Sequence, residues 1–284
     1  MQNKSFAAFI LTHGRADHVY TYNTLRNCGY TGKVYFIIDN EDSQIEQYKE
    51  NYGKQVIVFD KKEIAKTFDA GDNFNDRRAI IYARNASFEI AKSLNLKYFI
   101  QLDDDYTGFR YQFNSQHKYS GKPILNLDNV FGLMLEYYKS TTFKSIAFGQ
   151  GGDYLGGQNG GYSKKIFAKR KCMNSFICST DRPFQFVGRI NEDVNTYTWF
   201  QSLGNLFLTI LMLRLEQKTT QANSGGMTEL YLDTGTYLKS FYSVMYSPSP
   251  VKIETMKSNH KRLHHKITWK NAVPVIISED YKLK

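Results

Sequence analysis

Four short apolar runs in the first 110 residues each end in polar or acidic residues, and this pattern constrains the fold more than any other feature. The runs are Phe6 to Thr12, Lys33 to Asp39, Gln55 to Asp60, and Lys97 to Leu102 followed by three aspartates. Continuous apolar runs of this length are typical of strands buried on both faces of a sheet. The stretches between them, 19–26, 43–52 and 77–94, are compatible with helices. The alternation predicts an α/β fold with a mostly parallel central sheet and helices on both faces.

The ends of these predicted strands carry most of the candidate functional residues of the first half. Asp39 and Asp60 close the second and third runs, and Asp103, Asp104 and Asp105 follow the fourth. In open α/β sheets, ligands bind outside the carboxyl ends of the strands. We therefore expect a ligand site at this edge of the sheet.

The alternation of strand and helix ends after about residue 110. Beyond it lie a glycine-rich loop at 149–161, a basic stretch at 164–171 and a polar, aromatic C-terminal half. Neither a Pro/Ser-rich linker nor an internal repeat separates the halves. We expect one domain over residues 1–284, in which 1–110 bind a nucleotide and 111–284 supply the site of a second substrate.

The excess of basic residues indicates an anionic partner. The chain has 37 Lys and Arg against 27 Asp and Glu, a formal net charge of +10, which suits nucleic acid, a nucleotide or an anionic membrane. The N-terminus lacks the pattern of a signal peptide, and the apolar stretch 203–215 is shorter than the roughly 20 residues of a membrane span. We expect a soluble, non-secreted protein. Its three scattered cysteines match neither a disulfide framework nor a zinc site.

Asp103 and Asp105 form the strongest local signal, a D-x-D pair that ends an apolar strand. Two carboxylates so placed can bind a hard divalent cation, Mg²⁺ or Mn²⁺, whose other positions take diphosphate oxygens. Nucleotide-sugar transferases use this arrangement, so Asp103 and Asp105 are candidate metal ligands and Asp103 and Asp104 candidate donor-binding residues. An acidic turn that caps the next element is the structural alternative.

Further residues near the same edge are candidates for binding the donor. Asp39 can accept hydrogen bonds from a ribose or base. Thr12, His13 and Arg15 form the loop after the first strand, where Arg15 can pair with phosphate. Arg84 interrupts an apolar helix face and can turn inward toward the donor sugar or the carboxylates. Turn residues and a solvated arginine are the ordinary alternatives.

Glu192 and Asp193 form a second acidic site at the start of an expected helix. The amides of a helix N-terminus can orient these carboxylates, and one of them can act as general base toward an acceptor hydroxyl. The alternative is helix capping, since Asn191 is a natural N-cap and acidic residues are favoured in a first turn. The sequence leaves these two interpretations open.

His264 and His265 lie in a basic segment near the C-terminus, 259–270. A histidine here can complete the coordination of a metal ion or, when protonated, contact a diphosphate. Because adjacent residues on a strand point to opposite faces, we expect one of the two to be functional and the other structural. A basic surface strip is the alternative.

Four motifs, in this order, resemble those of the TET/JBP-associated glycosyltransferases, which occur in phages and are proposed to add sugars to hydroxymethylated pyrimidines in DNA. They are QLDDDY at the strand end, GRINEDVNTY at 188–197, the segment 217–249, and RLHHKITWKNAVPVII at 262–277. The resemblance covers most of the chain, from the first strand to Ile277. It implies a nucleotide-diphospho-sugar transferase fold of the GT-A type and an enzyme acting in the cytoplasm of an infected host.

The resemblance also implies roles for individual residues. Asp103 and Asp105 would form the metal and diphosphate site, and Asp193 would be the catalytic base, with Glu192 orienting it or contacting the acceptor. His264 or His265 would be a metal or diphosphate ligand. Basic residues of the stretch before the second acidic site would contact DNA phosphates, or would form a solvated helix face; they are Lys164, Lys165, Lys169, Arg170 and Lys171.

The implied reaction is a transfer, expected to invert the anomeric centre, of a sugar from a nucleotide donor, expected to be a UDP-sugar, to a hydroxymethylpyrimidine in DNA. Deprotonation of the hydroxymethyl oxygen by Asp193 would precede its attack on the anomeric carbon. One alternative is a GT-A enzyme with a glycan or protein acceptor. Another is a non-catalytic nucleic-acid-binding protein whose acidic clusters are structural.

Overall fold

The computed structural model describes residues 4–160, 170–218, 238–256, 262–272, 276–279 and 282. In these residues, nine strands form one sheet in the order β3-β2-β1-β4-β8-β7-β9-β5-β6, and two more form a separate hairpin. The strands of the large sheet are β1 (Phe6–Leu11), β2 (Lys33–Asp39), β3 (Val56–Phe59), β4 (Tyr98–Asp103), β5 (Tyr106–Phe113), β6 (Tyr119–Pro123), β7 (Ser145–Gly149), β8 (Ser175–Ser179) and β9 (Phe207–Gln217).

The predicted parallel arrangement is confirmed for the first four strands. β1 pairs in parallel with β2 and β4, and β2 pairs in parallel with β3. In the second half of the sheet only β8 and β5 run opposite to the others. The reversal at β5 has a simple cause: β5 starts three residues after β4 ends, so the chain leaves the carboxyl edge that β4 has just reached. The short turn between them, Asp104 and Asp105, therefore lies at that edge.

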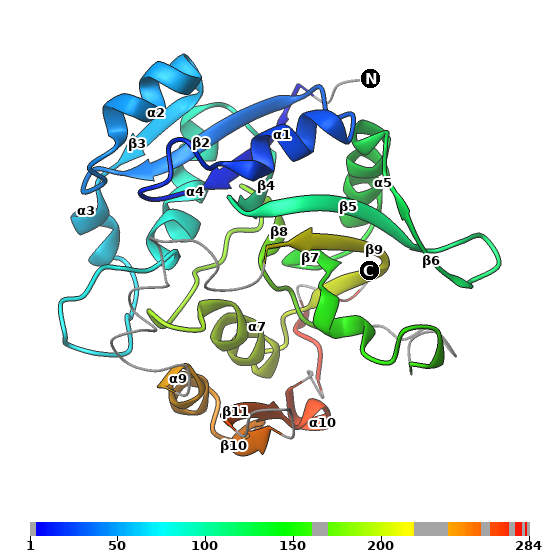
Figure 1. Cartoon of the computed structure of the whole chain (residues 1–284). Helices are drawn as coiled ribbons and strands as arrows, with labels where there is room; N and C mark the ends of the chain where they lie inside the picture. The colour runs from blue at the N-terminus through cyan, green and yellow to red at the C-terminus, as the bar shows by residue number, and fades with distance from the viewer. Residues whose placement is uncertain are drawn as a thin grey trace.

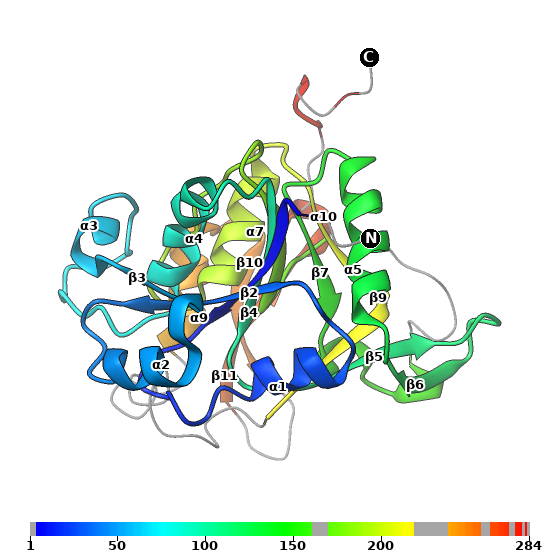
Figure 2. The same ribbon diagram turned by 90° about the horizontal axis from the view of Figure 1, so that it is seen from above.

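Helices cover both faces of the sheet, as Figures 1 and 2 show. One face packs against α1 (Tyr20–Asn27), α2 (Ile45–Tyr52) and α5 (Leu127–Lys139), and the other against α3 (Lys61–Ala65), α4 (Ile81–Ser93) and α7 (Glu192–Ser202). Short 3-10 helices are η1 (Gly53–Gln55), η2 (Gly151–Tyr154) and η3 (Gly157–Asn159). The α/β fold with helices on both faces is thus confirmed.

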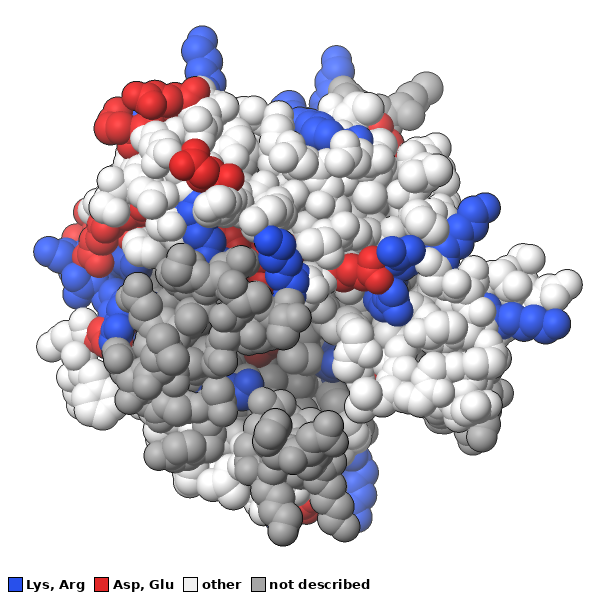
Figure 3. All heavy atoms as spheres, viewed as in Figure 1, with Lys and Arg blue, Asp and Glu red and all other residues white. Residues whose placement is uncertain are grey.

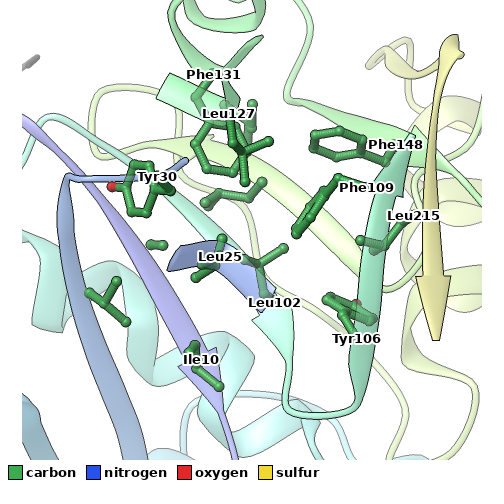
Figure 4. Close-up of a cluster of buried hydrophobic side chains, with 14 of the residues drawn as sticks. Ile10, Leu25, Tyr30, Leu102, Tyr106, Phe109, Leu127, Phe131, Phe148 and Leu215 are labelled. Atoms are coloured by element: carbon green, nitrogen blue, oxygen red, sulfur yellow. The ribbon is translucent and has the colours of Figure 1, made fainter. Parts of the chain in front are cut away.

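Alternating side chains of each buried strand divide the core into two layers. On β1, Ala8 and Ile10 pack toward the first face, and Ala7 and Phe9 toward the second. This period of two is the geometry of a strand covered on both sides. Figure 4 shows the layer beneath α5, where Phe109 and other aromatic rings meet the side chains of the central strands. Such a core makes the strand ends a rigid support for a site.

The C-terminal segment packs beneath α7 rather than on the sheet (Figure 1). It contains α9 (Leu238–Tyr246), the antiparallel hairpin of β10 (Val251–Met256) and β11 (Arg262–Ile267), and α10 (Trp269–Ala272). The Trp269 ring stacks on Tyr197 of α7, with ring centroids 6.1 Å apart and an interplanar angle of 11°. The second acidic site is therefore enclosed between the sheet and this segment.

Cys28, Cys172 and Cys178 are free thiols, as the sequence predicts. Burial raises the pKa of the Cys172 thiol to about 12, which makes this residue an unreactive part of the core. None of the helices in the described ranges combines the length and the apolar character that crossing a bilayer requires.

Candidate active site

The loop after β1 is held to the β4 end by Asp104. The Thr12 hydroxyl donates to Oδ2 of Asp104 at 2.7 Å, and Nη1 of Arg15 lies 2.8 Å from Oδ1. The hydroxyl of Tyr48 contacts Thr12 Oγ1 at 2.9 Å and accepts from the Arg15 amide at 2.8 Å. Both oxygens of Asp104 are thereby engaged inside the protein, so this carboxylate shapes the loop that follows β1.

Asp39, at the end of β2, binds two basic side chains. Its Oδ2 lies 2.8 Å from Nδ1 of His13, and its Oδ1 lies 3.2 Å from Nζ of Lys61, which is itself buried. The hydrogen bond to Asp39 raises the pKa of His13. Burial acts to raise the pKa of Asp39, but the bonds to His13 and Lys61 outweigh it and lower that pKa. Asp39 is therefore an ionised acceptor at the predicted edge.

Lys61 and Asp42 belong to this cluster and were not predicted. Asp42 accepts a hydrogen bond from the Gly14 amide at 2.7 Å. Both residues follow strand ends closely, Asp42 after β2 and Lys61 after β3, so their positions in the sequence carried a signal for the same edge. Asp60, in contrast, accepts from the amides of Lys62 and Glu63 and is the N-cap of α3.

The predicted inward turn of Arg84 is confirmed, and it is directed toward carboxylates. Its Nε donates to Oε1 of Glu192 at 2.8 Å, and its Nη2 donates to Oδ1 of Asp103 at 3.0 Å. Its guanidinium carbon lies 4.9 Å from the centre of the Phe176 ring. Arg84 is 1% exposed, so it acts through these two carboxylates rather than by touching a ligand. Asp103 and Glu192, 89 residues apart, thus belong to one cluster.

The remaining carboxylates of the D-x-D motif lack full compensation of their charge. Burial, with a contribution from the neighbouring acids, raises the pKa of Asp103 to about 8 even though Arg84 lowers it. Burial and Asp104 raise the pKa of Asp105 to about 6. Raised pKa values that result from desolvation and like charges are typical of functional sites. The strand end is therefore a place where added positive charge would be stabilised.

Asp193 lies in the first turn of α7 and is 6% exposed. Its Oδ1 accepts from the Val194 amide at 2.7 Å. Burial and the adjacent Glu192 raise the pKa of Asp193 to about 6. A carboxylate that titrates near neutral pH has the proton affinity that a general base needs. Glu192, in contrast, is bound to Arg84, so Asp193 is the carboxylate of the pair that no arginine among the described residues binds.

The turn before Glu192 is fixed by residues from distant segments. Asn191 has a φ of 62°, in the left-handed region, and its side chain caps no amide of α7. Its side-chain amide donates to Ser243 Oγ at 2.5 Å and lies 3.4 Å from Nδ1 of His265. Asn191 thus stands at the N-cap position of α7, as the capping alternative has it, but its side chain makes no cap hydrogen bond and binds Ser243 of α9 instead.

Arg189 anchors the same turn and was not predicted. Its guanidinium is bound to Asp72 at 2.9 Å and to Asp76 at 3.0 Å, and it reaches the hydroxyl of Tyr242 on α9 at 3.3 Å. A buried arginine with two carboxylate partners holds its backbone firmly. In the sequence, Arg189 lies between Gly188 and Ile190. This local pattern does not indicate an anchoring role.

The two C-terminal histidines lie on β11. Burial, followed by the charges of His264, Lys239 and Lys171, lowers the pKa of His265 to about 3. The two rings approach with centroids 4.2 Å apart, so they are not separated onto unrelated surfaces as strand alternation suggests. In the part of the chain that is described, no three His, Cys, Asp or Glu side chains are grouped closely enough to hold a metal ion. The four predicted ligands do not form one ready-made site.

The basic stretch predicted to contact DNA is only partly described. Lys164, Lys165 and Lys169 lie outside the described residues, and Arg170 is half-buried, with its carbonyl accepting from Gln201. Lys171 is 8% exposed, and its Nζ lies 2.6 Å from Oδ1 of Asp153. The prediction for Lys171 as a surface phosphate contact is corrected, because this amino group is occupied inside the protein.

Three solved structures cover most of the chain at low identity. Glucosyl-3-phosphoglycerate synthase from Mycobacterium tuberculosis, in complex with Mg²⁺ and UDP, is 9% identical over 93% of this chain and 88% of its own, with a TM-score of 0.46. A mannosyltransferase from Pyrobaculum calidifontis, in complex with GDP-Man and Mn²⁺, is 9% identical over 85% and 73%, with a TM-score of 0.47. TarS from S. aureus is 12% identical over 85% and 39%, with a TM-score of 0.43.

A comparison with curated protein sequences finds no match. The family described as TET-Associated Glycosyltransferase matches residues 6–226, a span that includes every strand of the large sheet and both acidic sites. Because this match covers well over half of the 284 residues, the chain belongs to the TET-associated glycosyltransferases and is a glycosyltransferase.

Proposed function

We propose that this protein transfers a sugar from a nucleotide-diphospho-sugar, a UDP-sugar, to the hydroxymethyl group of 5-hydroxymethylcytosine or 5-hydroxymethyluracil in DNA. The observation that carries the proposal is the bridge from Asp103 through Arg84 to Glu192, which joins the D-x-D strand end to the acidic pair on α7. A donor site and a base for the acceptor are needed side by side in such a transfer. The parallel order β3-β2-β1-β4 ending in this motif supports a fold of the GT-A type.

The donor would lie at the carboxyl edge of β1, β2 and β4, within the half formed by residues 1–110. Asp39 would accept from the ribose or base, and the raised pKa of the adjacent His13 favours contact with an anion. Arg15, fixed by Asp104, lies in the loop that would approach the phosphates. Thr12 and Asp104 would support this loop from inside.

A divalent cation, Mg²⁺ or Mn²⁺, fits the carboxylates of Asp103 and Asp105. Both are hard oxygen donors, and the pKa of each is raised because burial and neighbouring acids leave its negative charge poorly compensated. When bound, the ion would stabilise the departing nucleoside diphosphate as a Lewis acid. Within this chain, Arg84 would hold the Asp103 carboxylate in place. The β4–β5 turn would position the Asp105 carboxylate.

The acceptor would bind in the half formed by residues 111–284, with its hydroxyl facing Asp193. Direct displacement by that oxygen inverts the anomeric centre. Figure 3 shows Lys and Arg scattered among acidic side chains over the described part of one face, so the net charge of +10 is spread rather than gathered there. DNA as acceptor is supported by the family and by this charge, and such an enzyme would act in the cytoplasm of an infected host.

The proposal predicts a mass increase on modified DNA. We incubate duplexes that contain 5-hydroxymethylcytosine, 5-hydroxymethyluracil or neither with wild-type protein, Mn²⁺ and a panel of nucleotide sugars. The DNA is then digested, and the masses of the nucleosides are measured by mass spectrometry. We expect one donor to add a hexose or pentose to a hydroxymethylated nucleoside and nothing to appear on unmodified DNA. Transfer to glycans in a parallel incubation, with every DNA left unchanged, would favour the glycan acceptor instead.

A double substitution tests the donor site. Asp103→Asn with Asp105→Asn removes two anionic oxygen donors, so Mn²⁺-dependent binding of the nucleoside diphosphate should weaken by at least about tenfold and transfer should fall by more. Isothermal titration of UDP with and without Mn²⁺ measures the first effect. Asp60→Asn, which alters only the cap of α3, is the matched control. DNA binding that is unchanged or stronger in the double variant, together with a wild type that shows no Mn²⁺-dependent binding of UDP, would favour a non-catalytic nucleic-acid-binding protein.

A further inference from the structure

The segment 69–77 joins α3 to α4 and lies beside α9 (Figure 1). Its residues contact the turn before α7 on one side and the loop after β2 on the other. The proposed transfer takes place between these two regions, the acidic pair and the donor-binding strand end. We propose that the segment is a brace that sets the position of Asp193 relative to the donor, and that Arg189 is the positioning residue that attaches it. The inference rests on the proposed function, because it takes Asp193 as the base.

The backbone of the turn before α7 is bonded to the brace. The amide of Gly188 donates to the Asp69 carbonyl at 2.9 Å, and the amide of Arg189 donates to the Ala70 carbonyl at 2.7 Å. On its other side the turn packs against α7: a Cβ atom on Gly188, whose φ is 78°, would lie 2.3 Å from Nδ2 of Asn195. The turn is therefore confined between the brace and the helix that carries the acidic pair.

The Arg189 side chain closes the brace into a loop. Its guanidinium binds both Asp72 and Asp76, and the hydroxyl of Tyr242 on α9 donates a further hydrogen bond to Asp72. Arg189 is 2% exposed, so it acts through these partners. A planar guanidinium binds carboxylates in a fixed geometry, which a flexible ammonium group does not. One residue of the turn thus holds the brace at two points.

Asn191, two residues further along, shows why the turn needs this attachment. Its φ of 62° lies in the left-handed region, which residues other than glycine adopt uncommonly. Such a conformation persists where the surrounding structure holds it. Arg189 holds the turn from the side of the brace, and Ser243 holds it from α9. Because Glu192 follows directly, the direction of the Asp193 carboxylate depends on these two attachments.

The other end of the brace reaches the donor side. Nη2 of Arg77 lies 2.6 Å from Oε1 of Glu41, and the Glu41 amide donates to Oδ1 of Asp39 at 3.1 Å. Contacts therefore run from the strand end proposed to bind the ribose or base, through residues 76 and 77, to the Arg189 guanidinium. A displacement of about 1 Å between reacting groups can cost about a hundredfold in rate. The brace thus fixes a distance on which the transfer depends.

Arg189→Lys tests the brace, because lysine keeps the positive charge but cannot hold both carboxylates in the same geometry. We expect kcat for sugar transfer to fall about 10- to 100-fold, while Mn²⁺-dependent binding of UDP, measured by isothermal titration, changes by less than about twofold. Asp76→Asn, a milder change within the brace, should lower kcat by less. Arg182→Lys is the matched control: this arginine binds three backbone carbonyls at the opposite edge of the sheet, and the variant should leave kcat unchanged.

A combination of variants separates positioning from general stability. In the Asp193→Asn background, Arg189→Lys should lower kcat little further, because Arg189 acts through the base that is already missing. An arginine with a merely structural role would lower kcat by the same factor in both backgrounds. Equal losses in the two backgrounds, or a loss no larger than that of Arg182→Lys, would overturn the inference.

Hydrogen exchange, followed by mass spectrometry, gives a readout that needs no acceptor. In Arg189→Lys the amides of 187–191 should exchange about tenfold faster than in the wild type, and in Arg182→Lys they should not. Unchanged exchange in this turn would also refute the brace. If the wild type modifies glycans and leaves hydroxymethylated DNA unchanged, the DNA acceptor is wrong, and the kinetic comparison is made with the glycan. A wild type that modifies DNA, with Arg189→Lys equally active, would contradict the brace alone.

Discussion

Replacing Asp193 with Asn should lower kcat for sugar transfer by about two to four orders of magnitude, the range that general-base catalysis contributes. Asn cannot accept the hydroxyl proton, but it keeps the shape of the side chain and can still accept from the Val194 amide, the contact seen at 2.7 Å. KM for the donor should change little, because Asp193 lies on α7 rather than at the D-x-D strand end. Steady-state kinetics with a hydroxymethylated duplex measures both constants.

The same substitution should stabilise the protein. Burial and Glu192 raise the pKa of Asp193 to about 6, above the roughly 3.9 of an unfolded chain. The stabilising effect of a raised carboxyl pKa is fully present below the unfolded value and is lost as pH rises through the folded one. Asp193→Asn removes this pH dependence, so its gain over wild type should be near zero at pH 4 and reach about 1–3 kcal/mol at pH 7.5.

Two further measurements complete this test. In the wild type, kcat/KM should fall about tenfold per unit as pH drops below about 6, because only the ionised carboxylate is a base. Asp181→Asn is the control, since this exposed acid pairs with Lys97 at the other edge of the sheet and should change neither rate nor stability. A variant of Asp193 that retained kcat within tenfold would show that another group takes the proton.

Replacing Arg84 with Met should lower the free energy of unfolding by about 3–5 kcal/mol, as removal of one partner from a buried ion pair does. Met fills much of the volume of the Arg side chain, so the loss of stability comes from the missing positive charge and not from a cavity. Asp103 and Glu192 would both remain in the interior without their shared cation. Urea unfolding at pH 7.5 measures the change.

Two companion variants identify the cause of that loss. Arg77→Met breaks a pair with Glu41 that lies at the surface, and it should cost no more than about 1 kcal/mol. Arg84→Met combined with Glu192→Gln should be more stable than Arg84→Met alone, because one orphaned charge has been neutralised. A loss below 1 kcal/mol for Arg84→Met, or no recovery in the double variant, would mean that the bridge does not organise the site.

The elements of the first half could be predicted because each strand carries its own local signal. Apolar runs and their polar ends located β1 to β4 within one or two residues, and with them the edge at which Asp39 and Asp103 lie. The helix α7 was likewise expected at Glu192. Hydrophobic periodicity indicates which side chains of a strand or helix are buried, and it can be seen in the local sequence alone.

The partners of the charged residues could not be predicted in the same way. Arg84 was correctly expected to turn inward, but its bond to Glu192 spans 108 positions. Lys171 resembled its basic neighbours in sequence and yet is buried against Asp153. Asn191 looked like a helix cap and instead binds Ser243 of α9. Each of these contacts depends on how distant elements pack.

The sequence by itself therefore determined the α/β class, the edge that carries the site and the acidic residues at its centre. Only the tertiary structure decided which contacts those residues make: Asp104 holds a loop, Glu192 is bound to Arg84, and burial beside Glu192 raises the pKa of Asp193, the residue that we propose as the base. The physical reason is that hydrophobic pattern is local, whereas the pKa of a buried carboxyl is set by the charges that folding brings beside it.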